Sequence, residues 1–336
     1  MGVTAMADIK KQVVILASAH CLFSGIAGPM DMFLQAGVIW NWFNEQQLSP
    51  YFEVKIVTLD GEPVIASNEM PIIPHCSIEE IKHVDLIILP SQGSQFGLKD
   101  KAFYQRVEWL KKWYKRGTDL ASICTGAFAL AETGLLDGKK ATTHWAVEKV
   151  FRKSYPKVDL RTDLLVTDEG HVFCGGGITA DVSLALYLIN KYCGREIALQ
   201  CSRCSLVDLD RLSQLPFSIF MPQKGHQDAE VQMIQNWIEI NFDKQLNLEK
   251  LAERASISPR QFNRRFKKAT GETVNKYIQL IRVEAAKKAL EQSQSSFDQI
   301  TIDVGYENVS YLRRLFKQVT SLTPAEYRIK FGNFVG

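Results

Sequence analysis

The chain has 336 residues, of which 46% are hydrophobic and 23% charged, and its formal net charge is +3. This length and composition are typical of a globular protein with more than one domain and a real core in each. No apolar run reaches the roughly 18–20 residues of a membrane helix, and an odd number of scattered cysteines without a secretion signal predicts reduced thiols in a cytoplasm.

Residues 10–200 alternate apolar β-type runs with amphipathic segments, which predicts a doubly wound, flavodoxin-like α/β domain around a parallel sheet. Two of the runs are continuously apolar, as expected for strands covered on both faces. The predicted strands are residues 12–18, 52–59, 85–89, 120–123, 141–143, 164–168 and 171–174. The predicted helices are residues 29–42, 103–114, 126–133, 146–154 and 179–191.

This rhythm is lost after residue 205, where the sequence predicts a domain boundary. We expect an α/β domain over residues 10–205, a linker over residues 206–226, and an all-α domain over residues 227–336. The last segment has a charge balance of +4, which leaves −1 for the rest of the chain. The excess positive charge therefore lies where a phosphate-bearing partner would need it.

Helix caps are readable in the third segment. Asn247 is a predicted N-cap, Ser258 is an N-cap followed by proline, and Thr323 forms a capping box with Glu326. Gly271 and Gly305 are expected to end helices or form turns. These signals predict a series of short helices with defined ends.

An imperfect repeat organises these helices. Phe266-Lys267-Lys268 recurs as Phe316-Lys317-Gln318 at an offset of 50, and residues further upstream match at an offset of 49. Each copy predicts a helix, a turn and a basic helix: residues 248–255 and 259–269, then residues 297–304 and 308–319. A long helix over residues 273–293 would hold the two basic helices about 34 Å apart, which suits successive major grooves of DNA.

The apolar residues of each basic helix share one face, so the basic residues project elsewhere. The predicted core residues are Phe262, Phe266, Ala269, Leu312, Leu315 and Phe316. A single basic helix is most simply a solvated face, whereas two copies with matching turns and caps favour reading of base edges. The sequence therefore predicts two helix-turn-helix motifs that bind double-stranded DNA.

Residues 251–278 (LAERASISPRQFNRRFKKATGETVNKYI) and 300–328 (ITIDVGYENVSYLRRLFKQVTSLTPAEYR) resemble the AraC/XylS DNA-binding domain. The resemblance implies base contacts by Arg260, Asn263, Arg264, Ser310, Tyr311 and Arg314. Four further basic residues of the same helices are expected at the DNA: Lys267, Lys268, Arg313 and Lys317. One departure is Thr301, where alanine is usual, and its added bulk is expected to loosen the second motif.

A cysteine lies where an apolar strand of the first domain runs into a helix. Cys124 at this turn is typical of a nucleophile elbow, in which the helix N-terminus favours a thiolate. His144 follows the next predicted strand, and parallel strands would bring both residues to one edge of the sheet. A Cys–His pair can carry out acyl transfer or hydration of an electrophile.

Residues 10–195 resemble the PfpI-like branch of the class I glutamine amidotransferase superfamily, through residues 28–33, 124–145 and 175–181. The residue that is acidic in enzymes of that branch is Gly25 here, so no catalytic residue is expected and Cys124 and His144 are vestigial candidates. The resemblance implies a ligand site formed by Cys124, Thr125, His144, Gly25 and Gly176. Genuine catalysis by Cys124, as a hydrolase, hydratase or amidase, is the alternative, and a purely dimerising domain is the third possibility.

The two halves together resemble the GlxA-like transcription regulators, in which a PfpI-like sensor is fused to an AraC-type DNA reader. This resemblance implies a cytoplasmic homodimer that responds to an unknown small molecule and contacts promoter DNA, with RNA polymerase as a possible further partner. No cofactor or metal is expected, because Cys201 and Cys204 lack a second ligand pair.

Overall fold

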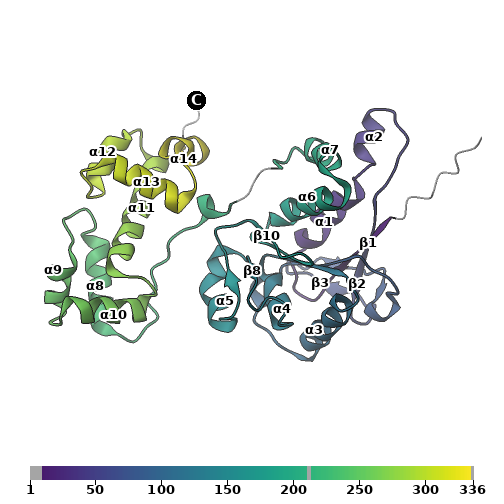
Figure 1. Cartoon of the computed structure of the whole chain (residues 1–336), viewed down its shortest axis with the longest axis horizontal. Helices are drawn as coiled ribbons and strands as arrows, with labels where there is room; N and C mark the ends of the chain where they lie inside the picture. Colours follow the sequence, from purple (N-terminus) through teal and green to yellow (C-terminus); the bar gives the residue numbers. More distant parts are fainter. Residues whose placement is uncertain (1–9, 210–212, 334–336) are drawn as a thin grey trace, which may run out of the picture. The chain divides into compact units, whose positions relative to one another are not determined.

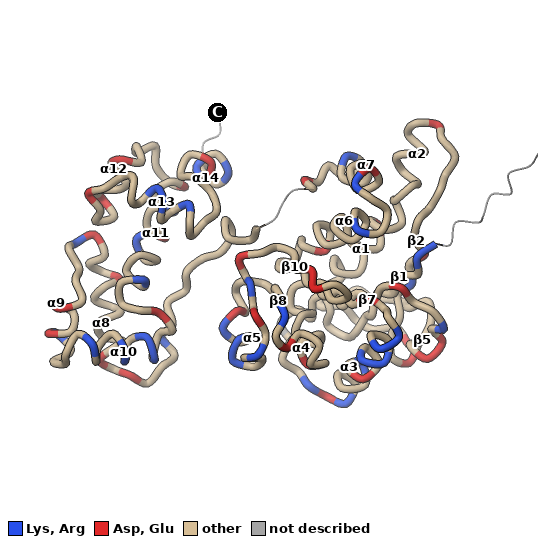
Figure 2. The backbone as a smooth tube through the Cα atoms, viewed as in Figure 1, with Lys and Arg blue, Asp and Glu red and all other residues tan. Residues whose placement is uncertain are grey.

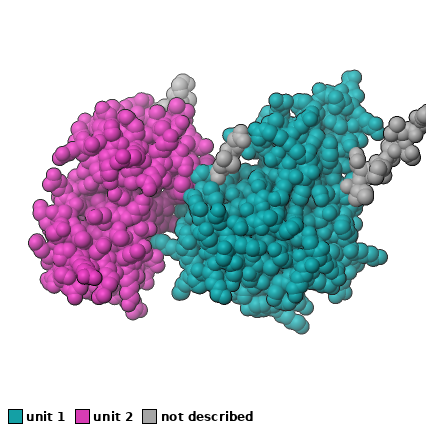
Figure 3. Space-filling model, viewed as in Figure 1, with its two compact units in different colours: residues 1–214 teal, residues 215–336 magenta. Residues whose placement is uncertain are grey.

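The computed structural model describes residues 10–209 and 213–333. The chain divides into two compact units, residues 1–214 and 215–336, which Figure 3 shows in different colours. Within the described residues, no helix is long and apolar enough to cross a membrane. Each unit is built around its own buried apolar clusters.

Unit 1 is an α/β domain around a seven-stranded sheet of order β10-β11-β7-β6-β1-β2-β5, in which only β10 runs antiparallel to its neighbour (Figure 1). The strands are β1 (Lys11–Leu16), β2 (Phe52–Thr58), β5 (Cys76–Ser77), β6 (Leu86–Leu89), β7 (Asp119–Ile123), β10 (Val166–Asp168) and β11 (Val172–Gly175). The predicted doubly wound parallel sheet is confirmed.

Alternate residues of each central strand face opposite helical layers. Val13 and Ile15 of β1 lie in one apolar cluster, whereas Val14 and Leu16 lie in the other. The first cluster is completed by α1 (Ser24–Leu34), α6 (Ala180–Cys193) and α7 (Arg195–Ser205). The second is completed by α3 (Lys101–Tyr114), α4 (Ala127–Glu132) and α5 (Glu148–Ser154). Both faces of the sheet are therefore buried, which explains the continuous apolar runs.

Two predicted elements of unit 1 differ from the structure. The helix expected over residues 29–42 begins earlier, encloses Pro29, and is interrupted at Gly37, which separates α1 from α2 (Ile39–Phe43). Gly37 has a φ of +73°, and a Cβ there would lie 2.0 Å from the Ser49 carbonyl oxygen. The left-handed backbone ends the helix, because only glycine fits this close approach.

The strand expected over residues 141–143 is also different. β8 (Lys140–Ala141) pairs with β9 (Asp159–Leu160) in a separate two-stranded sheet and does not join the main one. A second small sheet contains β3 (Val64–Ile65) and β4 (Pro71–Ile72), which the sequence pattern did not reveal. Strands of two residues are too short to show an alternating pattern.

In the described residues 215–333, unit 2 contains helices joined by loops and no strand. Its helices are α8 (Ala229–Ile240), α9 (Leu248–Arg254), α10 (Pro259–Thr270), α11 (Val274–Gln292), α12 (Phe297–Asp303), α13 (Val309–Thr320) and α14 (Pro324–Phe331). One apolar cluster joins α8, α9, α10 and the start of α11, and another joins the end of α11 to α12, α13 and α14. The long helix α11 therefore contributes to both cores, and the predicted pair of helix-turn-helix motifs is confirmed (Figure 1).

The predicted caps are confirmed as well. The side chains of Asn247, Ser258 and Thr323 accept hydrogen bonds from the first turns of α9, α10 and α14. Gly271 ends α10 in a left-handed conformation, and Gly305 does the same in the turn after α12. Local sequence chemistry thus sets the ends of these helices.

The segment that connects the units is anchored on both sides. Gln214, the last residue of unit 1, is buried, and its amide nitrogen donates to the carbonyl oxygens of Thr143 and Leu164. In unit 2, the Lys287 ammonium donates to the Ser218 carbonyl, and the Phe220 amide donates to Glu284. Residues that composition assigned to a linker therefore have specific partners.

Candidate functional site

The second helices of the two motifs, α10 and α13, have one apolar and one basic face. Phe262 and Phe266 of α10 are fully buried, as are Leu312 and Phe316 of α13. Lys and Arg residues, blue in the backbone trace of Figure 2, occur along both helices. Amphipathic helices of this kind bury one face in the protein and leave the other for a partner.

Eight of the ten side chains predicted to contact DNA are exposed. They are Arg260, Arg264, Lys267, Lys268, Ser310, Arg313, Arg314 and Lys317. None of the seven basic residues forms an ion pair with a carboxylate of the described chain. Arg314 lies over the Tyr311 ring at 5.8 Å and Arg313 over the Phe297 ring at 5.9 Å, so both guanidinium groups stay at the surface. Unpaired cations on this face suit phosphate and guanine contacts.

The other two predicted contacts have partners inside the domain. The Asn263 side-chain oxygen accepts from the Val274 amide at 3.1 Å, at the first residue of α11. The Tyr311 hydroxyl accepts from the Gln279 amide nitrogen at 2.8 Å, and its ring lies 5.4 Å from that of Tyr306. Both side chains are half-buried, so each helps to position its motif.

Two arginines that the sequence did not single out hold the domain together. Arg265 of α10 forms ion pairs with Asp228 and Glu230 at the start of α8. Buried Arg282 of α11 donates to the carbonyl oxygens of Phe242 and Lys244, at 2.8 and 2.7 Å. The sequence contains a signal for Arg265 alone: it lies three residues after Phe262, on the face of the helix that packs against the protein.

The expected loosening by Thr301 is not found. The side chain is fully buried, and its hydroxyl donates to the Phe297 carbonyl at 2.7 Å. A buried hydroxyl with a hydrogen-bond partner carries little penalty. The second core therefore accommodates the residue.

Cys124 has the backbone of a nucleophile elbow. Its φ is +54°, at the point where β7 meets the 3₁₀ turn Cys124–Gly126. Gly126 makes the sharp turn possible, since a Cβ there would lie 2.5 Å from the Leu89 carbonyl oxygen. A strained residue at a strand–helix junction is a common feature of functional sites.

The chemistry expected of this cysteine is not supported. Cys124 is 3% exposed, and burial raises the pKa of its thiol despite hydrogen bonding to Ser91 and Thr125. The expected thiolate would require a lowered pKa. The Thr125 hydroxyl is itself occupied, since it contacts Ser91 Oγ and accepts from the Gln92 amide.

The expected Cys124–His144 pair has no hydrogen bond between its two side chains in the described part of the chain. His144 Nδ1 accepts from the Ala146 amide at 3.1 Å. Burial alone lowers the pKa of His144. The preceding strand β8 pairs with β9 in a separate sheet, and Thr143, the residue before His144, donates to the Cys124 carbonyl oxygen at 2.8 Å.

The two glycines of the predicted ligand site face protein atoms. A Cβ at Gly25 would lie 3.2 Å from Pro90 Cβ, and one at Gly176 would lie 2.5 Å from the Gln214 amide nitrogen. A carboxylate that the sequence reasoning did not identify, Asp181, is buried against Gly28. Burial raises its pKa to about 6. In the sequence, only its place in the motif of residues 175–181 pointed to Asp181.

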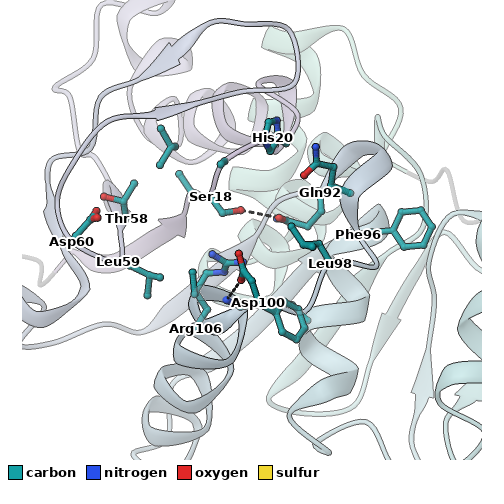
Figure 4. A pocket seen from close by; sticks show the side chains of 17 residues that line it. Ser18, His20, Thr58, Leu59, Asp60, Gln92, Phe96, Leu98, Asp100 and Arg106 are labelled. Carbon is teal, nitrogen blue, oxygen red and sulfur yellow. Dashed lines mark hydrogen bonds between the residues drawn. The ribbon is translucent and has the colours of Figure 1, made fainter.

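A cavity lies at the carboxyl edge of the main sheet, and Cys124 does not line it. It has a volume of about 290 Å³ and is formed by residues that follow β1, β2 and β6, together with the start of α3 (Figure 4). None of the five residues predicted to bind the ligand lines it. Gln92 does line it, and the Gln92 amide donates to Thr125, which follows Cys124.

Comparison with known families agrees with this division of the chain. The DJ-1/PfpI family matches residues 35–191, and the family described as a helix-turn-helix domain matches residues 251–330. The first match lies in unit 1 and the second in unit 2.

Similar proteins include regulators and an enzyme. The chain is 29% identical over 284 residues to the HTH-type transcriptional regulator CdhR of Pseudomonas aeruginosa. This match covers 81% of this chain and 80% of CdhR. The chain is also 31% identical over 149 residues to isonitrile hydratase of Pseudomonas putida. That match covers 44% of this chain and 63% of the enzyme. The crystal structure of a putative transcriptional regulator protein from Vibrio parahaemolyticus has a TM-score of 0.51 at 23% identity and covers 58% of this chain and 98% of its own, which supports the fold.

Proposed function

We propose that this chain, which combines a DJ-1/PfpI domain with an AraC-type helix-turn-helix domain as the GlxA-like regulators do, is a sequence-specific transcription regulator whose first domain senses a small molecule. The observation that carries the proposal is the presence of two exposed basic helices, α10 and α13, in matching motifs joined by one continuous helix. Two such helices on a rigid connector suit adjacent major grooves.

The test is selection of bound DNA from a random library with the full chain. Arg264→Ala is expected to weaken binding to the selected site by about 1–3 kcal/mol and to relax preference at one base position, since arginine reads guanine through two hydrogen bonds. Lys268→Ala is expected to weaken binding to all DNA sequences alike and to reduce the salt dependence of the binding affinity, because a lysine that contacts a phosphate does not read the base sequence. Unchanged selection by Arg264→Ala would contradict our assignment of the first helix.

Lys288 provides the matched control. It is an exposed lysine of α11 that lines a hollow with residues 216–219 instead of lying on α10 or α13. Lys288→Ala removes the same charge from the same unit and is expected to leave both selection and the salt dependence nearly unchanged. A loss equal to that of Lys268→Ala would indicate a nonspecific effect of charge.

We propose that the signal from unit 1 passes through Gln214. Thr143 contacts both the Cys124 carbonyl and the Gln214 amide, and Gln214 immediately precedes the residues anchored on unit 2. A ligand that shifts the Cys124 turn would change the partners of Gln214 and so the population competent to bind DNA. Gln214→Ala is expected to uncouple DNA affinity from ligand while leaving ligand binding intact.

Homodimerisation is supported by an apolar surface on α2. Trp42 and Phe43 are 67% and 64% exposed, and their rings lie 5.2 Å apart. Large exposed aromatic pairs are typical of protein interfaces. Sedimentation of Trp42→Glu should show monomers if this surface pairs two copies.

Contact of the DNA-bound dimer with RNA polymerase, in the cytoplasm, completes the proposal.

The alternative function is cysteine-dependent catalysis, which the strained backbone at Cys124 favours. The buried thiol, its raised pKa and the absence of an acid at Gly25 count against it. Incubation with isonitriles, α-oxoaldehydes and amides, compared with Cys124→Ala, distinguishes the two. We expect no cysteine-dependent turnover, and iodoacetamide should react at the rate of an ordinary buried thiol.

A further inference from the structure

The cavity of about 290 Å³ lies where the direction of chain winding reverses. From β1 the chain proceeds to β2 and β5 on one side, and later places β6 on the other side of β1. The lining residues 17–20 and 58–60, together with Gln92, Gln95, Phe96 and Leu98, lie at or after the carboxyl ends of β1, β2 and β6. In open α/β sheets this reversal point is where ligands bind.

One arginine points into the cavity from α3. Figure 4 shows Arg106 directed toward Ser18 and Asp100. It is half-buried, and within the described residues its guanidinium forms neither an ion pair nor a hydrogen bond. Burial lowers its pKa. A guanidinium has five N–H donors that need acceptors, and since none of the Arg106 nitrogens is among the buried polar atoms of the described residues that lack a partner, water or a ligand in the cavity can supply them.

Nearby carboxylates do not meet this need. Asp100 accepts from the Phe103 amide at 2.7 Å as the N-cap of α3, and Asp60 accepts from the Glu62 amide at 3.1 Å. Neither comes within ion-pair distance of Arg106, although Asp100 attracts it electrostatically. Asp100 therefore attracts the cation without pairing with it, and the N–H donors at the edges of the guanidinium remain available.

The remaining walls define the size and character of a ligand. Leu59, Val64, Leu98 and Ala129 supply apolar surface, whereas Ser18, whose hydroxyl donates to Gln92 at 2.7 Å, is polar. The volume admits only a small molecule, at the lower end of ligand cavities. His20 at the cavity has a φ of +62°, a strained backbone that marks many binding sites.

We propose that this cavity binds a small carboxylate with a short apolar body, whose two oxygens form paired hydrogen bonds with Arg106. A carboxylate matches the fork of a guanidinium in shape and charge. The inference rests on the proposed function in one respect: the bound carboxylate is taken to be the effector. Its route to Cys124 is the Gln92–Thr125 hydrogen bond of 2.9 Å.

Isothermal titration of the full chain tests the binding. The probes are acetate, butyrate, succinate and glutamate, with butyramide as the uncharged match of butyrate and inorganic phosphate as a different anion. We expect at least one carboxylate to bind at millimolar concentration or below, and neither butyramide nor phosphate to do so. R106Q should weaken the best probe by about tenfold or more. R116Q is the control, because Arg116 lies just beyond the end of α3 and does not line this cavity. This variant should bind the best probe as tightly as the unchanged chain does.

A second variant protects the test against misfolding. Leu98 lines the cavity and is largely exposed, so L98W should obstruct the cavity without disturbing the core, and it should also abolish binding. Failure of all four carboxylates to bind, binding of phosphate alone, or equal binding by R106Q would overturn the proposal.

DNA binding separates this inference from the proposed function. If a carboxylate binds through Arg106 and shifts affinity for the selected DNA site, both stand. If it binds through Arg106 without changing DNA affinity, the site stands and its effector role fails. If the chain selects no DNA at all, the proposed function fails while the titration still decides the cavity.

Discussion

The two helix-turn-helix motifs share one internal design. Thr270 and Thr320 each donate to the carbonyl four residues earlier and accept from the amide two residues later. Tyr277 and Tyr327 each donate to a glutamate at 2.7 Å, Glu239 on α8 and Glu291 on α11. The helix α11 therefore has two roles. It contributes Tyr277 to the first motif, and it supplies the glutamate of the second motif, as α8 does for the first. The sequence repeat is a repeat of hydrogen bonds as well as of apolar residues.

The motifs differ where the backbone is left-handed. The turn between their helices contains Ser256 with a φ of +54° in the first motif and Gly305 with a φ of +83° in the second. The end of the second helix has the opposite arrangement, with Gly271 at +86° and Ser321 at +63°. Each motif therefore has glycine at one of its two left-handed positions, and the choice reflects space, since a Cβ at Gly305 would lie 2.5 Å from the Asp243 carbonyl oxygen.

The largest effect is expected from Gly305→Ala. The new methyl group would meet backbone, and the left-handed conformation adds strain, so the second motif should lose about 3 kcal/mol or more. Hydrogen exchange of the full chain should show faster exchange in α12 and α13 than in α9 and α10.

Gly271→Ala is the matched control for this change. Its φ is +86°, but no atom lies within 4 Å of the added Cβ, so only the backbone strain remains, at about 1 kcal/mol. Equal losses from the two variants would show that the contact with Asp243 does not matter.

The shared tyrosines should give the next largest effect. Tyr277→Phe and Tyr327→Phe each remove a hydrogen bond to a carboxylate, and each should cost about 1.5–2 kcal/mol. Burial raises the pKa of both hydroxyls, so both stay protonated donors at any ordinary pH. Urea denaturation followed by hydrogen exchange should locate each loss in its own motif; a loss in one motif alone would contradict the equivalence.

Asn263 distinguishes the motifs in a different way. Its oxygen accepts from the Val274 amide, the first residue of α11, whereas the equivalent first residue of α14 is Pro324, which has no N–H. The position that matches Asn263 is Arg313, which is exposed. The proline removes the need for an acceptor and so leaves that position available for DNA.

We therefore expect Asn263→Ala to cost about 1 kcal/mol in the first motif, because it leaves a helix amide without its partner. In a Val274→Pro background the same substitution should cost much less, as a double-mutant cycle of thermal stability would measure. Equal costs in both backgrounds would mean that the hydrogen bond contributes nothing.

Caps, turns and buried phenylalanines of unit 2 were predictable because each depends on residues that are close in sequence. Ser258 and Pro259, for example, specify a helix start without help from the rest of the chain. The doubly wound sheet was predictable for a related reason, since apolar runs alternate with amphipathic segments.

The candidate sites were less predictable because they depend on distant pairs. Gln214 fills the space beside Gly176, and β8, which precedes His144, pairs with β9 outside the main sheet. Nothing near Arg106 in the sequence indicates that its guanidinium lacks a partner. Such facts follow from tertiary packing, in which the same residue type has different neighbours in different folds.

The smallest effect is expected at the end of α13. Ser321 has a φ of +63°, a conformation that glycine adopts without penalty, and its equivalent in the first motif is Gly271. Ser321→Gly should stabilise the second motif by about 0.5–1 kcal/mol, since relief of strain outweighs the added freedom of the unfolded chain. Gly271→Ser should destabilise the first motif by a similar amount. Differential scanning calorimetry of the two single variants and the double variant should show opposite shifts that nearly cancel. Shifts of the same sign would mean that the two helix ends differ in more than their left-handed residue.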